Sequence, residues 1–258
     1  MSGRAHAGHT VRRLEPAEGV CGEDAGVYRN IARKLDWCLT RPFAKRALSL
    51  GIRSGCALDA GCGPGRLAAH LARLAPGMKV WALDISADML KETAARAARA
   101  GLGDRIVPAP GDMRSLPFPD DSFDLVTSMF AFHHLPDPRT ALKEMLRVVR
   151  PGGAVIVQDF IRPESDRWIE WMVRFLGTLQ WYGPAEREQY RDSLHAGLGR
   201  GEAERLREDG FRLSFCRPLS LFVLERAARP CCFALPGTKR VRGALRPAYG
   251  AVFAETVA

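Results

Sequence analysis

Short apolar runs alternate along the chain with longer stretches in which apolar residues recur every three or four positions. From Cys56 onward, five of these runs are continuous rather than alternating, which is typical of parallel strands covered by helices on both faces. The runs lie at 57–60, 79–83, 105–107, 123–127 and 154–157. The repeated order of run and helical stretch predicts βαβ units and a parallel sheet.

The helical stretches between these runs have recognisable ends. Helices are predicted over residues 66–75 and 87–100, the second of them capped by Ser86. Asp137 and Pro138 start another helix, which the Pro-Gly-Gly sequence at 151–153 stops. A helix near 202–208 precedes two further apolar runs, 211–216 and 219–224. Only a short turn separates these two runs, so they should pair antiparallel, which brings the predicted sheet to seven strands.

Length and composition are those of one ordinary globular domain with additions. The 258 residues are enough for one sizeable α/β core and short for two. No stretch is long and apolar enough to span a membrane, and the first residues lack the apolar core of a secretory signal, so we expect a soluble, cytoplasmic protein. The seven cysteines show no zinc-ligand spacing, which predicts reduced thiols and no metal site.

The net charge of +9 raises the question of a nucleic-acid partner. Most of the excess is arginine dispersed over the predicted helices, and one concentrated run lies near the C-terminus at 239–242. A dispersed excess favours solubility and weak attraction of anions before it favours a groove for phosphates. Nucleic acid is therefore not the expected partner.

The most informative segment follows the first predicted strand. An acid and three alternate glycines, Asp59, Gly61, Gly63 and Gly65, lead directly into the next helix. Glycines let the chain turn tightly and let a ligand approach the backbone. The exposed amides and the helix N-terminus are then expected to form a polar surface at the carboxyl end of the sheet, where open α/β folds bind ligands.

Three further strand ends point to the same crevice. The second strand ends in Asp84, where a carboxylate can accept hydrogen bonds from both hydroxyls of a ribose. The third strand is followed by Asp112, within reach of an exocyclic adenine amine, and the fourth ends at Phe130. Each acid also has a structural interpretation, as a cap or a turn former.

Together these motifs resemble the class I S-adenosylmethionine-dependent methyltransferases, in particular those of ubiquinone and menaquinone biosynthesis. The resemblance covers residues 56–160 closely and 161–226 loosely. It implies a Rossmann-like, doubly wound α/β fold with a seven-stranded, mostly parallel sheet and an antiparallel last strand. It also implies S-adenosylmethionine as cofactor, with these contacts: Asp59, Gly61, Gly63 and Gly65 at the methionine side, Asp84 at the ribose, Ile85, Asp112 and Met113 at the adenine, and Phe130 near the methionine.

Methyl transfer from a sulfonium needs little acid catalysis, because the leaving group already carries the positive charge. A base is needed only if the acceptor must lose a proton. His133 and His134 follow the fourth strand, where the acceptor should sit, and Asp159 ends the fifth; these three are the candidate catalytic residues, with Tyr28 a weaker one. Structural bracing is the alternative interpretation of each.

We expect a small, partly apolar acceptor that is methylated by in-line displacement. Residues 165–182 predict an amphipathic helix whose aromatic stripe either packs in the core or roofs the acceptor pocket. The fourth strand lacks the Asn/Asp-Pro-Pro-Tyr/Phe sequence that grips planar amines and amides, which disfavours DNA adenine and protein glutamine. The expected organisation is an N-terminal arm and helical lid at 1–50, a methyltransferase domain at 51–226 with an acceptor cap at 161–199, and a basic tail at 227–258.

Other functions stay open at this point. An NAD(P)-dependent oxidoreductase shares the strand, the glycine turn and the distal acid, but its glycines follow the spacing Gly-x-Gly-x-x-Gly. An RNA methyltransferase would use the basic tail, and a binding protein would keep the fold without turnover. The oligomeric state leaves no signal in the sequence.

Overall fold

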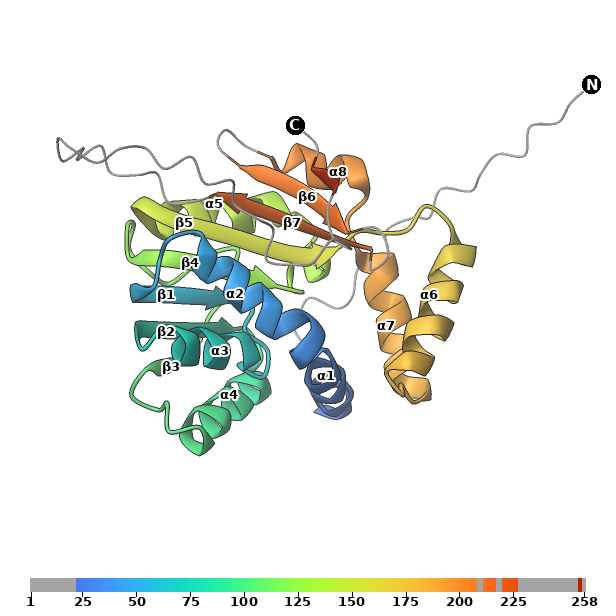
Figure 1. Ribbon diagram of the computed structural model, residues 1–258, viewed down its shortest axis with the longest axis horizontal. Helices are drawn as coiled ribbons and strands as arrows, with labels where there is room; N and C mark the ends of the chain where they lie inside the picture. Colours follow the sequence, from blue (N-terminus) through green and yellow to red (C-terminus); the bar gives the residue numbers. More distant parts are fainter. Residues whose placement is uncertain (1–21, 208–210, 217–219, 227–254, 257–258) are drawn as a thin grey trace, which may run out of the picture.

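The computed structural model describes residues 22–207, 211–216, 220–226 and 255–256. Its centre is one sheet with the strand order β3-β2-β1-β4-β5-β7-β6-β8 (Figure 1). The expected seven-stranded, mostly parallel sheet is confirmed, and a two-residue strand, β8 (Glu255–Thr256), pairs with β6 at the edge. Apart from β8, the basic tail expected at 227–258 lies outside the described residues, as do residues 1–21 of the expected N-terminal arm.

The parallel part of the sheet contains β1 (Ser54–Ala60), β2 (Gly77–Asp84), β3 (Ile106–Pro110), β4 (Phe123–Met129) and β5 (Val149–Phe160). Their carboxyl ends therefore meet at one edge. β7 (Leu221–Arg226) runs antiparallel to both β5 and β6 (Arg212–Cys216). The hairpin predicted from the two last apolar runs is thus present, with its turn at 217–219 outside the described residues.

Helices cover both faces of the sheet because strand residues point alternately to the two sides. On one face, α2 (Arg41–Ser49), α3 (Arg66–Leu74) and α4 (Ala87–Arg99) bury their apolar sides against Leu125 and Ile156. On the other, α5 (Pro138–Val148) and α8 (Arg200–Arg205) pack against Val126 and Val157. The continuous apolar runs in the sequence follow from this double coverage.

The predicted helix caps are confirmed. The Ser86 hydroxyl accepts a hydrogen bond from the Met89 amide at the start of α4, and Asp137 accepts one from the Arg139 amide at the start of α5. Each cap satisfies an amide that the helix itself cannot.

Three more helices lie beyond the carboxyl ends of the strands (Figure 1). They are α1 (Gly22–Leu35), α6 (Asp166–Leu179) and α7 (Pro184–Ala196), and a short π-helix, η1 (Asp36–Thr40), joins α1 to α2. Ile31 of α1, Met172 of α6 and Leu194 of α7 share one apolar cluster with Phe160 at the end of β5. This cluster holds a helical layer over the edge of the sheet where the glycine turn lies.

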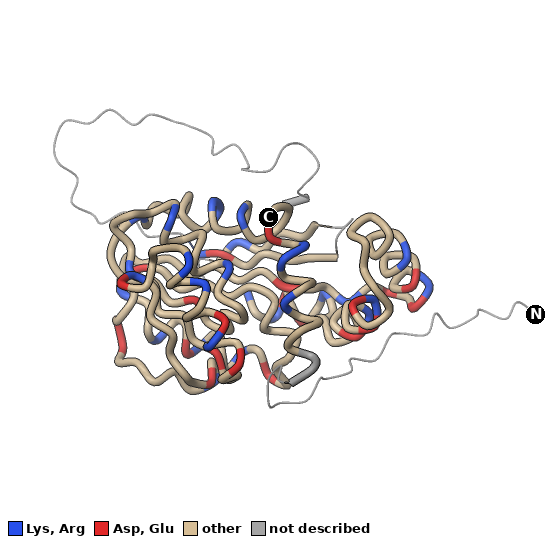
Figure 2. Tube along the Cα trace, turned by 90° about the horizontal axis from the view of Figure 1, so that it is seen from below, with Lys and Arg blue, Asp and Glu red and all other residues tan. Residues whose placement is uncertain are grey.

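The surface carries interspersed charges. In the view of Figure 2, Lys and Arg alternate with Asp and Glu over the described chain rather than gathering on one face. None of the described helices is both long and apolar enough to cross a membrane.

Candidate functional site

The glycine turn after β1 takes the left-handed conformation that its sequence predicts. Gly61, Gly63 and Gly65 have φ angles of 73°, 50° and 70°, a region that side chains disfavour. A Cβ at Gly61 would lie 2.5 Å from the Cβ of Ala131, and one at Gly65 would lie 2.6 Å from Oγ1 of Thr93. The turn therefore needs glycine for its conformation and for the space around it.

Asp84, at the end of β2, holds this turn in place. One carboxylate oxygen accepts a hydrogen bond from the Gly63 amide at 2.8 Å and the other accepts one from the Ser86 amide at 2.9 Å. Burial raises the pKa of Asp84, while these two amides oppose the rise. The Ile85 amide also lowers the pKa of Asp84 by hydrogen bonding, and a carboxylate with about four acceptor sites can still take a further donor. Ile85, the next residue, is about half exposed beside it.

Asp59 is fully buried at the end of β1. Its Oδ1 accepts a hydrogen bond from the Thr127 hydroxyl at 3.2 Å, and its Oδ2 accepts none from the described residues. Burial raises the pKa of this carboxyl to about 7, although the Thr127 hydroxyl lowers it. The Ala68 amide also lowers the pKa of this carboxyl, and Oδ2 is left available to a further donor.

Asp112 and Met113, the residues predicted to meet the adenine, have different surroundings. Arg114 donates hydrogen bonds to both carboxylate oxygens of Asp112, and this pairing lowers the pKa of Asp112. Met113 is buried, with its sulfur 3.9 Å from the Cβ that a side chain at Gly61 would have. The predicted adenine contact of Asp112 stays a prediction, and any amine there has to share the carboxylate with Arg114.

Asp159 and His133 form a buried pair at the ends of β5 and β4. Asp159 accepts hydrogen bonds from Nδ1 of His133 at 2.7 Å and from the amides of Phe132 and Phe160, both at 2.6 Å. Burial raises the pKa of Asp159, but the His133 imidazole and the Phe160 amide together hold it below its ordinary value. An ionised Asp159 fixes the imidazole and stabilises its protonated form. His134 lies against the His133 ring, with centroids 4.0 Å apart.

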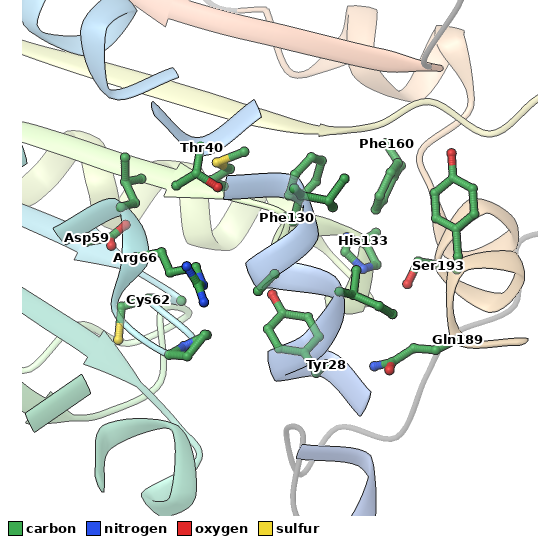
Figure 3. Close-up of a pocket in the computed structure, with 18 residues that line it drawn as sticks. Tyr28, Thr40, Asp59, Cys62, Arg66, Phe130, His133, Phe160, Gln189 and Ser193 are labelled. Atoms are coloured by element: carbon green, nitrogen blue, oxygen red, sulfur yellow. The ribbon is translucent and has the colours of Figure 1, made fainter. Parts of the chain in front are cut away.

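A cavity with an empty volume of about 720 Å³, open solvent included, joins the glycine turn to this pair (Figure 3). One wall is aromatic: the rings of Phe130 and Phe160 stack with centroids 4.7 Å apart, and Tyr190 meets Phe160 edge-on. Helix α1 on one side and α7 on the other complete the lining. The lining residues are Tyr28, Ile31, Ala32, Leu35, Thr40, Asp59, Gly61, Cys62, Pro64, Arg66, Leu67, Met129, Phe130, His133, Phe160, Gln189, Tyr190 and Ser193.

The structure thus brings part of the predicted site together. Asp59, Gly61, Phe130 and His133 line the cavity, and so does the weaker candidate Tyr28. Gly63 and Gly65 belong to the turn beside the cavity, and Asp84 accepts a hydrogen bond from the Gly63 amide. Asp159 contacts Nδ1 of His133. The lining includes none of Ile85, Asp112, Met113 or His134.

The aromatic stripe of α6 is placed differently from both expectations. Met172 packs inward, but Trp168, Trp171, Phe175 and Leu179 face solvent, and none of them lines the cavity. The stripe therefore neither fills the core nor roofs the pocket. Helix α7, which the sequence pattern did not predict, takes the position of the roof because it packs between α6 and α1.

Sequence reasoning also missed Arg66, the first residue of α3. Its guanidinium pairs with Asp36 of η1 at 3.2 Å, while its Nε is buried and has no hydrogen-bond partner among the described residues. Arg66 and Asp59 both line the end of the cavity at the glycine turn (Figure 3). The sequence signal that could have identified Arg66 as a site residue is its position directly after Gly65.

No group of three or more His, Cys, Asp or Glu side chains in the described part of the chain could hold a metal ion.

Comparison with known proteins identifies the family. Residues 58–157 match the family described as "Methyltransferase domain". The chain is 34% identical to 27-O-demethylrifamycin SV methyltransferase of Amycolatopsis mediterranei over 56% of this chain and 53% of that one. It is 40% identical to the ubiquinone/menaquinone biosynthesis C-methyltransferase UbiE of Hahella chejuensis over 45% of this chain and 47% of the relative. The chain thus spans about half the length of these relatives.

A longer match is to demethylmenaquinone methyltransferase of Geobacillus kaustophilus, at 35% identity over 60% of this chain and 70% of that protein. Among solved structures, a putative S-adenosyl-L-methionine-dependent methyltransferase of Methanococcus maripaludis shares the fold with a TM-score of 0.61 and 20% identity, over 85% of this chain and 98% of that one. The glycine turn, the strand-end acids, the sheet order and these matches agree: the chain belongs to the S-adenosylmethionine-dependent methyltransferases.

Proposed function

We propose that this protein transfers the methyl group of S-adenosylmethionine to a small, partly apolar acceptor bound between α1, α7 and the carboxyl ends of β4 and β5. The observation that carries the proposal is one continuous cavity that reaches from the glycine turn past an aromatic wall to His133. A cofactor site and an acceptor site have to share one space for methyl transfer, because the reacting atoms must approach in line.

The residues around the glycine turn fit the amino-acid end of the cofactor. Asp59 offers a buried carboxylate oxygen without a donor, and Arg66 offers a buried Nε without an acceptor. A carboxylate and a guanidinium at this end of the cavity are complementary to an α-ammonium and an α-carboxylate. Asp84 can take the ribose hydroxyls with its remaining lone pairs while it holds Gly63. S-adenosylmethionine supplies the electrophilic methyl group.

The acceptor end combines apolar walls with one proton acceptor. Phe130, Phe160 and Tyr190 offer ring faces and edges to a planar or apolar group. Since Nδ1 of His133 donates to the carboxylate of Asp159, the basic lone pair lies on Nε2. His133 is therefore the candidate general base for an acceptor that loses a proton, such as a hydroxyl, and Asp159 is its positioning residue.

The other functions considered from sequence gain no support. The matched family and relatives carry the names of methyltransferases, not of oxidoreductases. The basic tail on which an RNA acceptor would depend lies outside the described residues apart from β8.

The first experiment measures cofactor and acceptor separately. Isothermal titration with S-adenosylmethionine and with its demethylated product should give saturable heats, and R66Q should weaken both more than R73Q, which changes an exposed arginine near the other end of α3. Incubation with methyl-labelled cofactor and fractionated metabolites should then place label on a small molecule. Absent heats would overturn the cofactor assignment; label only on RNA or protein would overturn the acceptor assignment.

A further inference from the structure

Helix α6 presents an aromatic face that is largely exposed to solvent. Trp168, Trp171, Phe175 and Leu179 follow one another at spacings of three and four residues and are 42 to 66% exposed. The three rings stack in a row, with centroids 4.6 and 5.0 Å apart. We call this row the α6 stripe. It is larger than the scattered single apolar residues of an ordinary surface, so it indicates an interaction site.

The charges around the α6 stripe are unevenly paired. Glu170 is neutralised by Arg191 of α7, with Nε and Oε1 2.6 Å apart. Arg167 and Arg174 line the same shallow groove as Asp166 and Glu170. Arg174 contributes to the lowered pKa of Glu170, after the larger effect of Arg191. Asp166, in the first turn, lies 4.0 Å from Nδ1 of His195. The groove therefore offers two guanidinium groups beside an apolar stripe.

The position of α6 leaves this face accessible. In Figure 1, α6 is the outermost element at its end of the molecule, with α7 between it and the sheet. Its buried side, with Ile169, Met172 and Val173, faces α7 and the cluster at the end of β5. Trp181, just beyond α6, is 86% exposed and extends the apolar surface at the C-terminal end of the helix.

We propose that the α6 stripe docks this protein on the surface of a lipid bilayer that contains anionic phospholipid, with α6 lying in the plane of the interface. Helices that bind in this way carry Trp, Phe and Leu on one side and basic residues beside them. Tryptophan rings favour the level of the head groups, and arginine pairs with lipid phosphate while its stem covers apolar surface. Arg167 and Arg174 supply the charge complementarity.

The size of the stripe favours lipid over a second copy of the chain. A helix of 14 residues is about 21 Å long and about 10 Å wide, which gives a contact of roughly 200 Å². Stable protein interfaces bury about 800 Å² on each partner, several times as much. Interfacial membrane binding has no such threshold, because it scales with the apolar area buried plus the attraction to anionic lipid.

Docking through α6 would also serve the cavity. Helix α7 packs on α6 with one side and presents Gln189, Tyr190 and Ser193 to the cavity with another. Packed helices lie about 8 to 10 Å apart, so the acceptor end of the cavity would be one helix away from the bilayer. An apolar acceptor dissolved in the bilayer could then enter without crossing water; this consequence, unlike the docking itself, rests on the proposed function.

Vesicle sedimentation tests the proposal with the full chain. The protein should partition onto phosphatidylcholine vesicles that contain about one third phosphatidylglycerol, and W168A/W171A/F175A should lower the partition coefficient at least about tenfold. R167Q/R174Q should lower it more than R73Q/R99Q, which removes two exposed charges from α3 and α4 at the other end of the molecule. An unchanged melting temperature and an unchanged heat of binding for the demethylated cofactor would show that each variant is folded.

A second readout locates the contact. Brominated lipid should quench the tryptophan fluorescence of the wild-type protein, and W168F/W171F/W181F should keep its partition coefficient within about threefold while losing most of the quenching. No partitioning, or equal partitioning of the triple variant, would overturn the proposal. A dimer in sedimentation velocity that the triple variant dissociates would also overturn it, in favour of a second copy as occupant. Since cofactor binding is measured independently, none of these outcomes bears on methyl transfer.

Discussion

The buried carboxyl of Asp59 makes the free energy of unfolding of this protein depend on pH. Its carboxyl has a pKa of about 7 in the folded chain and about 3.9 when unfolded. Between about pH 4 and pH 7 the folded state therefore keeps a proton that the unfolded state releases, so the free energy of unfolding falls as the pH rises, by at most about 1.4 kcal/mol per unit.

Replacing this carboxyl should remove that pH dependence. D59N should lose less stability than the wild type between about pH 5 and pH 7 in urea unfolding without cofactor. D88N, which changes an exposed acid in the first turn of α4, is the matched control and should follow the wild type. Parallel curves for D59N and the wild type would contradict the raised pKa.

His133 and Asp159 should affect turnover and not cofactor binding. If the acceptor loses a proton, H133A should lower kcat by about 10² to 10⁴, because a positioned base contributes that much. D159N should lower it as well and shift the acidic limb of the pH profile downward, since an amide stabilises the protonated imidazole less than a carboxylate does. H134A is the control beside them; an equal loss in H134A would assign both histidines to bracing.

Alanine substitutions at two glycines measure how much the close packing around the glycine turn matters for stability. Gly65 and Gly101 have similar φ angles of 70° and 65°, but a Cβ at Gly65 meets Thr93 at 2.6 Å and one at Gly101 meets nothing within 4 Å. G101A should cost about 1 kcal/mol of unfolding free energy for its conformation alone. G65A should cost at least about 1 kcal/mol more and weaken cofactor binding, as urea unfolding and titration calorimetry would measure. Equal costs would show that the surroundings of Gly65 yield.

An ion pair between Lys34 and Glu186 joins helices α1 and α7. Lys34 donates to Glu186 at 2.5 Å and to the carbonyl of Trp181 at 2.9 Å, and Glu186 also accepts the Gly183 amide at the start of α7. The Lys34 amine is therefore bound to both the first turn of α7 and the loop before it.

Loss of this contact should loosen the acceptor side of the cavity. K34M should raise KM for the acceptor several-fold, because α7 lines the acceptor side of the cavity. It should change the cofactor Kd by less than about twofold, because Lys34 is remote from the glycine turn in sequence and does not line the cavity. K91M breaks an exposed pair with Asp88 and should change neither. A larger effect on cofactor Kd than on KM would place the function of Lys34 elsewhere.

The predictions from sequence succeeded for elements whose buried side is apolar. The strands of the parallel sheet are of this kind and were predicted from their continuous apolar runs. The glycine turn was predicted from its glycines, which the left-handed backbone conformation requires. Helix α7 was not predicted because its buried side includes Glu186, Ser193 and His195, so no apolar stripe marks it. Its only local signals are Pro184 at the first position and Glu186 two residues later, which holds the Gly183 amide.

Two further differences arise from pairing between distant segments. Strand β5 begins at Val149 rather than near Ala154, because Val149 already pairs with Phe123 and the register then shifts at the Pro-Gly-Gly sequence. The α6 stripe has helical periodicity in the sequence, but periodicity does not distinguish a buried side from an exposed one. The cofactor half of the site was therefore more predictable than the acceptor half.

The molecule should respond to cofactor as one cooperative unit. Helices α2, α3 and α4 share one apolar cluster with the sheet, and Arg46 of α2 donates to Glu225 of β7 at 2.8 Å. A ligand at about 100 times its Kd should stabilise the whole by about 2.7 kcal/mol. Differential scanning calorimetry with the demethylated cofactor should show a single transition that moves upward; a second, unshifted transition would mean that part of the chain folds independently.

The two halves of the cavity come from separate stretches of the chain. Helix α1, residues 59–67 and the end of β4 provide one part, whereas α7 belongs to the segment between β5 and β6. If the acceptor binds as proposed, exchange of this segment should change acceptor preference while the glycine turn stays intact. For enzyme engineering, residues 161–199 are the natural cassette to recombine between homologues.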